Sequence, residues 1–176
     1  MDYETIESES VFQGRIFDVQ IDRVRTPDGS VMRVDVVAHN GAVAIIAIDA
    51  RDNFLLVRQY RHPAGRVLLE LPAGTLHPGE EPQACARRES REEIGLEPGE
   101  LIHLGGAFMA PGYSTEFIHF FLARDLKSAP LPQDPDEDIE LVRVPRAEMQ
   151  ACVATGQIED VKTIAGISLA EAYLAG

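Results

Sequence analysis

One stretch, GTLHPGEEPQACARRESREEIGL from Gly74 to Leu96, constrains this chain more than any other. Pro82 suits the first turn of a helix and Gly95 suits its end, which predicts a helix over roughly Glu81 to Ile94. The second half of that helix is rich in carboxylates, which repel one another. The stretch therefore requires either solvent or a cation beside its acidic face.

The carboxylates cluster within two turns. Glu89 and Glu93 lie one turn apart, and Glu92 lies beside them. Like charges at these spacings destabilise a helix by roughly a few tenths of a kcal/mol per pair. One interpretation is a solvated face with ion pairs, because Arg88 and Glu92 have i, i+4 spacing. The other is a divalent-metal site, because hard cations such as Mg²⁺ prefer oxygen ligands and leave room for water and substrate phosphates.

The spacing of the whole stretch decides between these interpretations. It contains Gly74, five residues, Glu80, seven residues and then RESREEIGL from Arg88 to Leu96. This pattern resembles the Nudix box, G-x5-E-x7-R-E-U-x-E-E-x-G-U, in which U is a bulky apolar residue. All seven fixed positions match. Chance agreement is on the order of one in 10⁸ per start position, because each residue type has a usage of only several per cent.

The resemblance to the Nudix family implies a loop–helix–loop that holds Mg²⁺ or Mn²⁺ against a nucleoside diphosphate linked to another group. Such ions neutralise the pyrophosphate charge and lower the pKa of bound water. By the family pattern, Glu89 and Glu93 are the usual metal ligands, and Glu92 is the next candidate as ligand or catalytic group. Arg88 joins the catalytic set by orienting a box glutamate. The carbonyl of Ala73, before the first box glycine, is a further ligand.

Two box positions have a second interpretation. Glu80 supports the loop or the metal shell in the family pattern, but a carboxylate at a helix start also favours the helix dipole whatever the function. Ser90 departs from the box because it occupies the first apolar position. Its neighbours at i−4 and i+4 are Ala86 and Ile94, so we expect it to face the sheet, with the i−4 carbonyl as a partner for its hydroxyl.

Strand patterns surround this helix. FDVQIDRVR and VMRVDVVAH alternate apolar and polar residues on either side of the turn sequence TPDGS, which predicts a hairpin. AVAIIAI is almost continuously apolar and predicts a buried strand. Further strands are predicted at 54–60, 67–72, 101–108, 116–123 and 139–145, and helices near 146–155 and 161–174. This order predicts a mixed α+β domain with helices flanking a central sheet, and the Nudix resemblance implies an α/β/α sandwich with an N-terminal β-hairpin extension.

Flanking motifs narrow the family. ELPAG precedes the box, VRQYRHPAG lies further upstream, and Pro111 in APGYSTE follows Leu96 by 15 residues. Together these look like the ADP-ribose pyrophosphatase subgroup, over about Phe17 to Ala170. The resemblance implies cleavage of ADP-ribose or related ADP-sugars to AMP and a sugar phosphate. Relatives that hydrolyse GDP-mannose or other nucleotide sugars share much of this layout and remain the alternative.

The subgroup resemblance also assigns substrate contacts. Arg61 matches a position that contacts the substrate phosphates, and Pro111, Gly112 and Glu116 belong to a loop that reaches the substrate. Glu137, in the acidic run DPDEDIE, matches a glutamate that serves as metal ligand or general base. A surface arginine and a solvated acidic loop are the alternatives for Arg61 and Glu137.

Composition excludes other classes. A net charge of −13 argues against a nucleic-acid partner. No apolar run approaches the roughly 20 residues of a membrane span, and the acidic N-terminus lacks the core of a signal peptide, so we expect a cytoplasmic protein. Two cysteines fit free thiols and cannot form the four-cysteine zinc ribbon of NADH pyrophosphatases. Every box glutamate is present, and about 80 residues follow the box, which argues against a non-catalytic sensor with a second domain.

The subgroup resemblance also implies a domain organisation. We expect residues 1–40 to form N-terminal strands that act as a dimerisation arm, and residues 41–176 to form the Nudix hydrolase domain. Members of the subgroup are homodimers whose N-terminal strands help to form the partner's substrate pocket. The resemblance therefore implies a homodimer that binds a small nucleoside diphosphate sugar, without nucleic acid or membrane partners.

Overall fold

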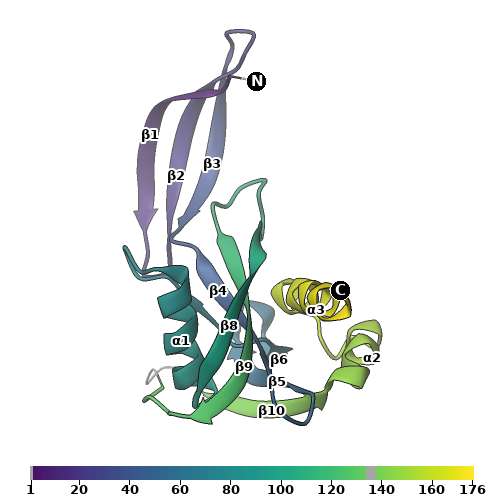
Figure 1. The fold of residues 1–176 in the computed structure, drawn as a ribbon. Coiled ribbons are helices and arrows are strands. Elements are labelled where there is room, and N and C mark those ends of the chain that lie inside the picture. The colour runs from purple at the N-terminus through teal and green to yellow at the C-terminus, as the bar shows by residue number, and fades with distance from the viewer. Residues whose placement is uncertain (1, 134–137) are drawn as a thin grey trace.

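Two β-sheets organise the chain in this computed structural model, which describes residues 2–133 and 138–176 (Figure 1). The smaller sheet is N-terminal and stands off from the rest, whereas helices cover both faces of the larger one. The two layers of helix around one sheet confirm the predicted α+β sandwich. Among the described residues, no helix has the length and apolar character that crossing a membrane requires.

The N-terminal sheet contains the predicted hairpin and one further strand. Its order is β1-β2-β3, antiparallel throughout, with β1 at Glu4–Gln13, β2 at Phe17–Arg25 and β3 at Val31–His39. The strand β1 was not predicted, because every residue of that strand is exposed and it has no buried apolar face to produce an alternating pattern. The backbone of β3 exchanges hydrogen bonds with the segment before β9, from Thr115 N to Val37 O at 3.0 Å and from Val37 N to Tyr113 O at 2.7 Å.

The larger sheet is mixed. Its main path is β10-β5-β4-β9-β8, in which β4 and β9 run parallel and the other neighbours run antiparallel; β6 adds to β5 and β7 to β4. The strands are β4 (Ala42–Ile48), β5 (Asn53–Arg61), β6 (Arg66–Glu70), β7 (Ala73–Thr75), β8 (Leu96–Phe108), β9 (Phe117–Ser128) and β10 (Ile139–Pro145). The predicted strands at 42–48 and 139–145 are confirmed to the residue, whereas β7 was not expected.

The helices divide between the two faces. They are α1 (Pro82–Glu93), α2 (Met149–Ala154) and α3 (Val161–Ala175), with short 3-10 turns at His62–Ala64 and Arg146–Glu148. In Figure 1, α1 lies on one side of the sheet, and α2 and α3 lie on the other. Val43 and Ile45 of β4 pack towards α1, and Ile46 packs towards α3. The continuous apolar run of β4 therefore reflects a strand that is covered on both faces.

The helix α1 begins and ends as the sequence predicts, within one residue at each end. Gly95 has a φ of 72°, the left-handed conformation that lets the chain reverse after the helix. Ser90 is fully buried, as expected, but the proposed hydrogen bond to the carbonyl of Ala86 is wrong. Its hydroxyl donates to the carbonyl of Leu96 at 2.6 Å, because the reversal at Gly95 brings Leu96 back beside the helix.

Candidate active site

Arg88 is the centre of the box. Its Nε and Nη2 atoms donate to the two carboxylate oxygens of Glu80, both at 3.0 Å. Its Nη1 donates to Glu89 Oε1 at 2.5 Å and to Glu92 Oε2 at 2.9 Å. One guanidinium thus joins three of the box carboxylates. The carboxylates that crowd α1 are compensated by a residue of the same helix.

The charges of this network reinforce one another. The hydrogen bonds from Arg88 are the main reason that the pKa of Glu80 falls to about 2, and the backbone N–H of His77 acts in the same direction. Conversely, the hydrogen bond to Glu80 raises the pKa of Arg88, and the charge of Glu89 adds to this shift. Both partners are therefore ionised across the physiological pH range. Glu80 lies in the loop before α1, where its carboxylate accepts from His77 N at 3.0 Å, so its bonds to Arg88 join this loop to the helix.

Gly74 makes room for Glu89. A Cβ atom at position 74 would overlap the carboxyl group of Glu89, which reaches over the glycine from α1. Glu89 is only 9% exposed, so its carboxylate is held between the helix and the loop. The first box glycine is thus required by a close approach of a side chain rather than by an unusual backbone conformation.

Glu93 contacts the same loop at Ala73, one residue before Gly74. Its Oε2 accepts a hydrogen bond from the backbone N–H of Ala73 at 2.9 Å, and the side chain is almost fully buried. Ala73 is presented by β7, which pairs antiparallel with β4 at Ala44. The short strand β7, which was not predicted, therefore sets the position of the backbone against which the last box glutamate lies.

Arg61 is the last residue of β5, and its guanidinium pairs with Glu70. Its Nε donates to Glu70 Oε1 at 3.0 Å and its Nη2 donates to Glu70 Oε2 at 2.8 Å. This hydrogen bonding is the main reason that the pKa of Arg61 is raised, and the negative charges of Glu93 and Asp160 act in the same direction. Arg61 is therefore within electrostatic reach of the box, as a residue that contacts substrate phosphates would be.

Glu70 and Lys162, which were not predicted as site residues, form the rest of this second network. Glu70 is the last residue of β6 and is 1% exposed. Lys162, in the first turn of α3, donates to Glu70 Oε2 and to Asp160 Oδ2, the latter at 2.8 Å. The pattern from Asp160 to Thr163 predicts a helix cap. It contains no information about a partner 92 residues away, which is the separation between Lys162 and Glu70.

The remaining predicted site residues belong to the loop between β8 and β9 or lie outside the described residues. Pro111 and Gly112 are exposed in the turn between β8 and β9, where Tyr113 N donates to Ala110 O at 3.1 Å. Glu116 follows them, and its carbonyl accepts from Met109 N at 3.1 Å. The backbone hydrogen bonds of this loop join it to β3. Glu137 lies outside the described residues.

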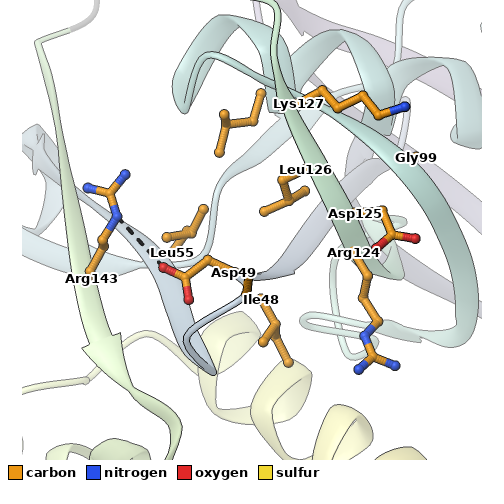
Figure 2. A pocket seen from close by; sticks show the side chains of 11 residues that line it. Ile48, Asp49, Leu55, Gly99, Arg124, Asp125, Leu126, Lys127 and Arg143 are labelled. Atoms are coloured by element: carbon orange, nitrogen blue, oxygen red, sulfur yellow. Dashed lines mark ion pairs between the residues drawn. The ribbon is translucent and has the colours of Figure 1, made fainter.

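A separate hollow of about 810 Å³ opens at the other end of β4 from the Gly74 loop. It is lined by Ile48 at that end of the strand, and by Arg124, Lys127 and Arg143 from β9 and β10. The three cationic side chains point in different directions, and Arg143 lies 3.8 Å from Asp49 (Figure 2). They do not converge as the cations of a phosphate site would, and none of the predicted site residues that the structure describes lines this hollow.

The box residues suit a divalent cation by their chemistry. Within residues 2–133 and 138–176, no group of three or more His, Cys, Asp or Glu side chains is already arranged around one point. The donors at the site are nevertheless carboxylate oxygens, which hard cations prefer. Glu89 and Glu93 are buried beside the backbone of residues 73 and 74, and the space at Gly74 holds one of these carboxylates against the loop.

A mixed sheet between helices, with a glycine loop and an acidic helix at box spacing, defines the Nudix-type domain. A model of the NUDIX domain matches residues 38–163, and the chain therefore belongs to the Nudix family. A second model, described as the nucleoside diphosphate sugar hydrolase N-terminal domain, matches residues 3–31.

Individual relatives agree with this family. The chain is 40% identical over 178 residues to an ADP-ribose pyrophosphatase of Mycobacterium tuberculosis, which covers 99% of this chain and 86% of that protein. It is 37% identical over 135 residues to a GDP-mannose pyrophosphatase of Citrobacter koseri, covering 71% of this chain and 70% of that one. A crystal structure of an ADP compounds hydrolase superposes with a TM-score of 0.89 at 26% identity, covering 100% of this chain and 96% of the other.

Proposed function

We propose that this protein hydrolyses the pyrophosphate bond of ADP-ribose or a related ADP-sugar, producing AMP and a sugar phosphate by attack of water on phosphorus. The observation that carries the proposal is the intact box. Glu89 and Glu93 lie against the loop at 73 and 74, and Arg88 joins Glu89 to Glu92. This arrangement occurs in a chain that is similar over nearly its whole length to a protein named ADP-ribose pyrophosphatase.

We assign the cation site to Glu89, Glu93 and the carbonyl of Ala73, with Glu92 as a further ligand or catalytic carboxylate. A bound Mg²⁺ or Mn²⁺ would neutralise the substrate phosphates and lower the pKa of the attacking water. Arg88 stays protonated and holds Glu89 and Glu92 in fixed orientations through charge-assisted hydrogen bonds. The chain's own contribution is thus a rigid set of oxygen donors beside a tight loop.

We assign the recognition of substrate phosphates to Arg61. Its Nε and Nη2 are held by Glu70, and among the described residues its Nη1 has no hydrogen-bond partner. A guanidinium fixed on one edge offers its remaining N–H groups to phosphate oxygens. Pro111, Gly112 and Glu116 are proposed to contact the substrate from the β8–β9 loop. Glu137 is proposed as general base or additional ligand.

A substrate screen tests this function. ADP-ribose, ADP-glucose, GDP-mannose and NADH are incubated with the protein and Mg²⁺, Mn²⁺ or EDTA, and the products are separated. We expect AMP and ribose phosphate from ADP-ribose, abolition by EDTA and restoration by either cation. GDP-mannose hydrolysis is the second candidate, because GDP-mannose pyrophosphatases are among the relatives. Binding of ADP-ribose without turnover under all conditions would contradict hydrolysis and indicate a sensor.

We also propose that residues 1–40 are a dimerisation arm beside the catalytic unit of residues 41–176, so that the protein is a homodimer. The N-terminal sheet stands away from the central sheet (Figure 1). It exposes apolar side chains, including Tyr3, Val11, Phe12, Ile16, Phe17, Val31 and Met32. Light scattering should give twice the chain mass of 19.3 kDa, and an active monomer would contradict the proposal. We propose the cytoplasm as its location, because both cysteines are free thiols.

A further inference from the structure

Lys162 occupies a position that is unfavourable for a lysine. It lies in the first turn of α3, where the helix dipole repels a positive charge, and it is only 9% exposed. Burial of an ammonium group is costly unless carboxylates surround it. A buried lysine at this end of a helix therefore indicates that specific partners hold it there.

Two carboxylates hold Lys162. Its Nζ donates to Asp160 Oδ2 at 2.8 Å and to Glu70 Oε2. Asp160 is the N-cap of α3, and its Oδ2 also accepts from Thr163 N at 3.0 Å. The hydroxyl of Thr163 in turn accepts from the backbone N–H of Leu71 at 2.8 Å. Lys162 and Thr163, in the first turn of α3, thus bond to Glu70, the last residue of β6, and to Leu71, the next residue towards the box loop.

This junction acts directly on Arg61. Both carboxylate oxygens of Glu70 accept from Arg61, and Oε2 also accepts from Lys162. Burial alone would raise the pKa of Glu70, but the hydrogen bonds and charges of Arg61 and Lys162 together lower it. Lys162 therefore shares in neutralising Glu70. Without the ammonium group of Lys162, Arg61 alone would have to compensate the buried carboxylate of Glu70. The orientation of the Arg61 side chain would then change.

We propose that Lys162 is a positioning residue, which locks Glu70 and thereby sets the Arg61 guanidinium for binding of the substrate phosphates beside Glu93. This inference rests on the proposed function of the site. A purely structural ion pair between α3 and β6 would hold the helix on the sheet without affecting substrate affinity. The two possibilities differ in what a substitution does to KM.

The chain supplies a matched control, because Lys127 is its only other lysine and is exposed on β9. Steady-state kinetics with ADP-ribose are compared for the wild type, K162M, K162R and K127M. We expect K162M to raise KM about 10-fold or more with kcat within about 3-fold, because the phosphate contact of Arg61 is weakened equally in ground and transition states. K162R should restore most of the affinity, and K127M should match the wild type. A folded K162M with wild-type KM would overturn the proposal.

A second measurement needs neither turnover nor substrate. The Nε–H signal of Arg61, assigned by its loss in R61K, is followed by ¹⁵N NMR in the wild type, K162M and D160N. We expect slow exchange with water in the wild type and at least about 10-fold faster exchange in K162M, because the Glu70 acceptor loosens. D160N keeps an N-cap acceptor and should show a smaller increase, which provides the test if K162M does not fold.

Unchanged exchange in D160N and in any folded K162M would overturn the positioning role. If the wild type hydrolyses none of the nucleotide sugars, the proposed function fails, but the exchange measurement still decides whether Lys162 positions Arg61. The failures of the two proposals are therefore distinguishable.

Discussion

The site contains two arginine networks that differ in how far apart their members lie in the chain. Arg88 contacts Glu80, Glu89 and Glu92, none of them more than eight residues away. Arg61 contacts Glu70 across a short hairpin, but Glu70 also accepts a hydrogen bond from Lys162, 92 residues further on. The first network forms within one loop and helix, whereas the second requires β5, β6 and α3 to pack together.

One ion pair of each network, Arg88–Glu92 and Lys162–Glu70, shows a difference in exposure. The side chains of Arg88 and Glu92 are each 24% exposed, so water shares in solvating their charges. Those of Glu70 and Lys162 are 2% and 11% exposed. Removing one partner from a buried pair leaves an uncompensated charge, which is more costly than at a partly solvated pair. We expect the Arg88 network to matter mainly for the chemistry, because it holds carboxylates assigned to the cation site, and the Arg61 network mainly for binding, because Arg61 is assigned to the substrate phosphates.

The largest effect is expected for E93Q, because Glu93 lies between the networks: it belongs to the box and its charge also acts on Arg61. A glutamine still accepts from Ala73 N, so the fold should persist, but a charged oxygen ligand is lost. We expect kcat with Mg²⁺ to fall by about 10³-fold. The exposed E100Q on β8 is the control and should keep wild-type kcat. A kcat within about 3-fold of wild type in E93Q would refute the ligand assignment.

The next effect in size is expected for G74A, which perturbs only the Arg88 network. The added methyl overlaps the Glu89 carboxyl, and because that group is the end of a flexible side chain, it is displaced while the backbone stays. We expect kcat to fall by about 10²-fold, with KM and Tm little changed. An increase in KM with unchanged kcat would reverse the contrast between the networks.

A smaller effect on stability, dependent on pH, is expected for E80Q. The pKa of Glu80 is lowered from its ordinary 4.5 to about 2, so its ionised form stabilises the fold above pH 4.5 and this stabilisation is lost as the pH falls towards 2. At pH 7, urea unfolding should show E80Q to be less stable by about 1–2 kcal/mol. This difference should narrow between pH 4.5 and 2. The neighbouring exposed E81Q should show neither effect, and a constant difference down to pH 2 would contradict the assignment.

The smallest effect is expected for S90A, on the side of α1 away from both networks. Losing the hydrogen bond to Leu96 O should destabilise the protein by about 1 kcal/mol, as measured by thermal or urea unfolding. The values of kcat and KM should not change, because the box carboxylates are untouched. A clear loss of activity at unchanged stability would mean that Ser90 belongs to the site after all.

Local patterns were predictable because they depend on neighbours in the chain. The apolar run at 42–48 specified a strand, and Pro82 and Gly95 marked the two ends of a helix. The observed bounds of both elements agree with these predictions within one residue. The strand β1 has no buried face, so its sequence contains no period that could indicate it. The hydroxyl of Ser90 donates to the carbonyl of Leu96, beyond the end of the helix. Helical geometry alone does not predict where that carbonyl lies.

The sequence by itself determined the box: its loop and helix are continuous, so helical periodicity is enough to bring Arg88 together with Glu92, one turn further on. The sequence also determined the family, through the spacing of the seven fixed residues of the box. Only the tertiary structure decided which groups surround Arg61, because Glu70 and Lys162 meet through the packing of α3 against the central sheet. Contacts between distant segments depend on how the whole chain packs, and no local spacing encodes that.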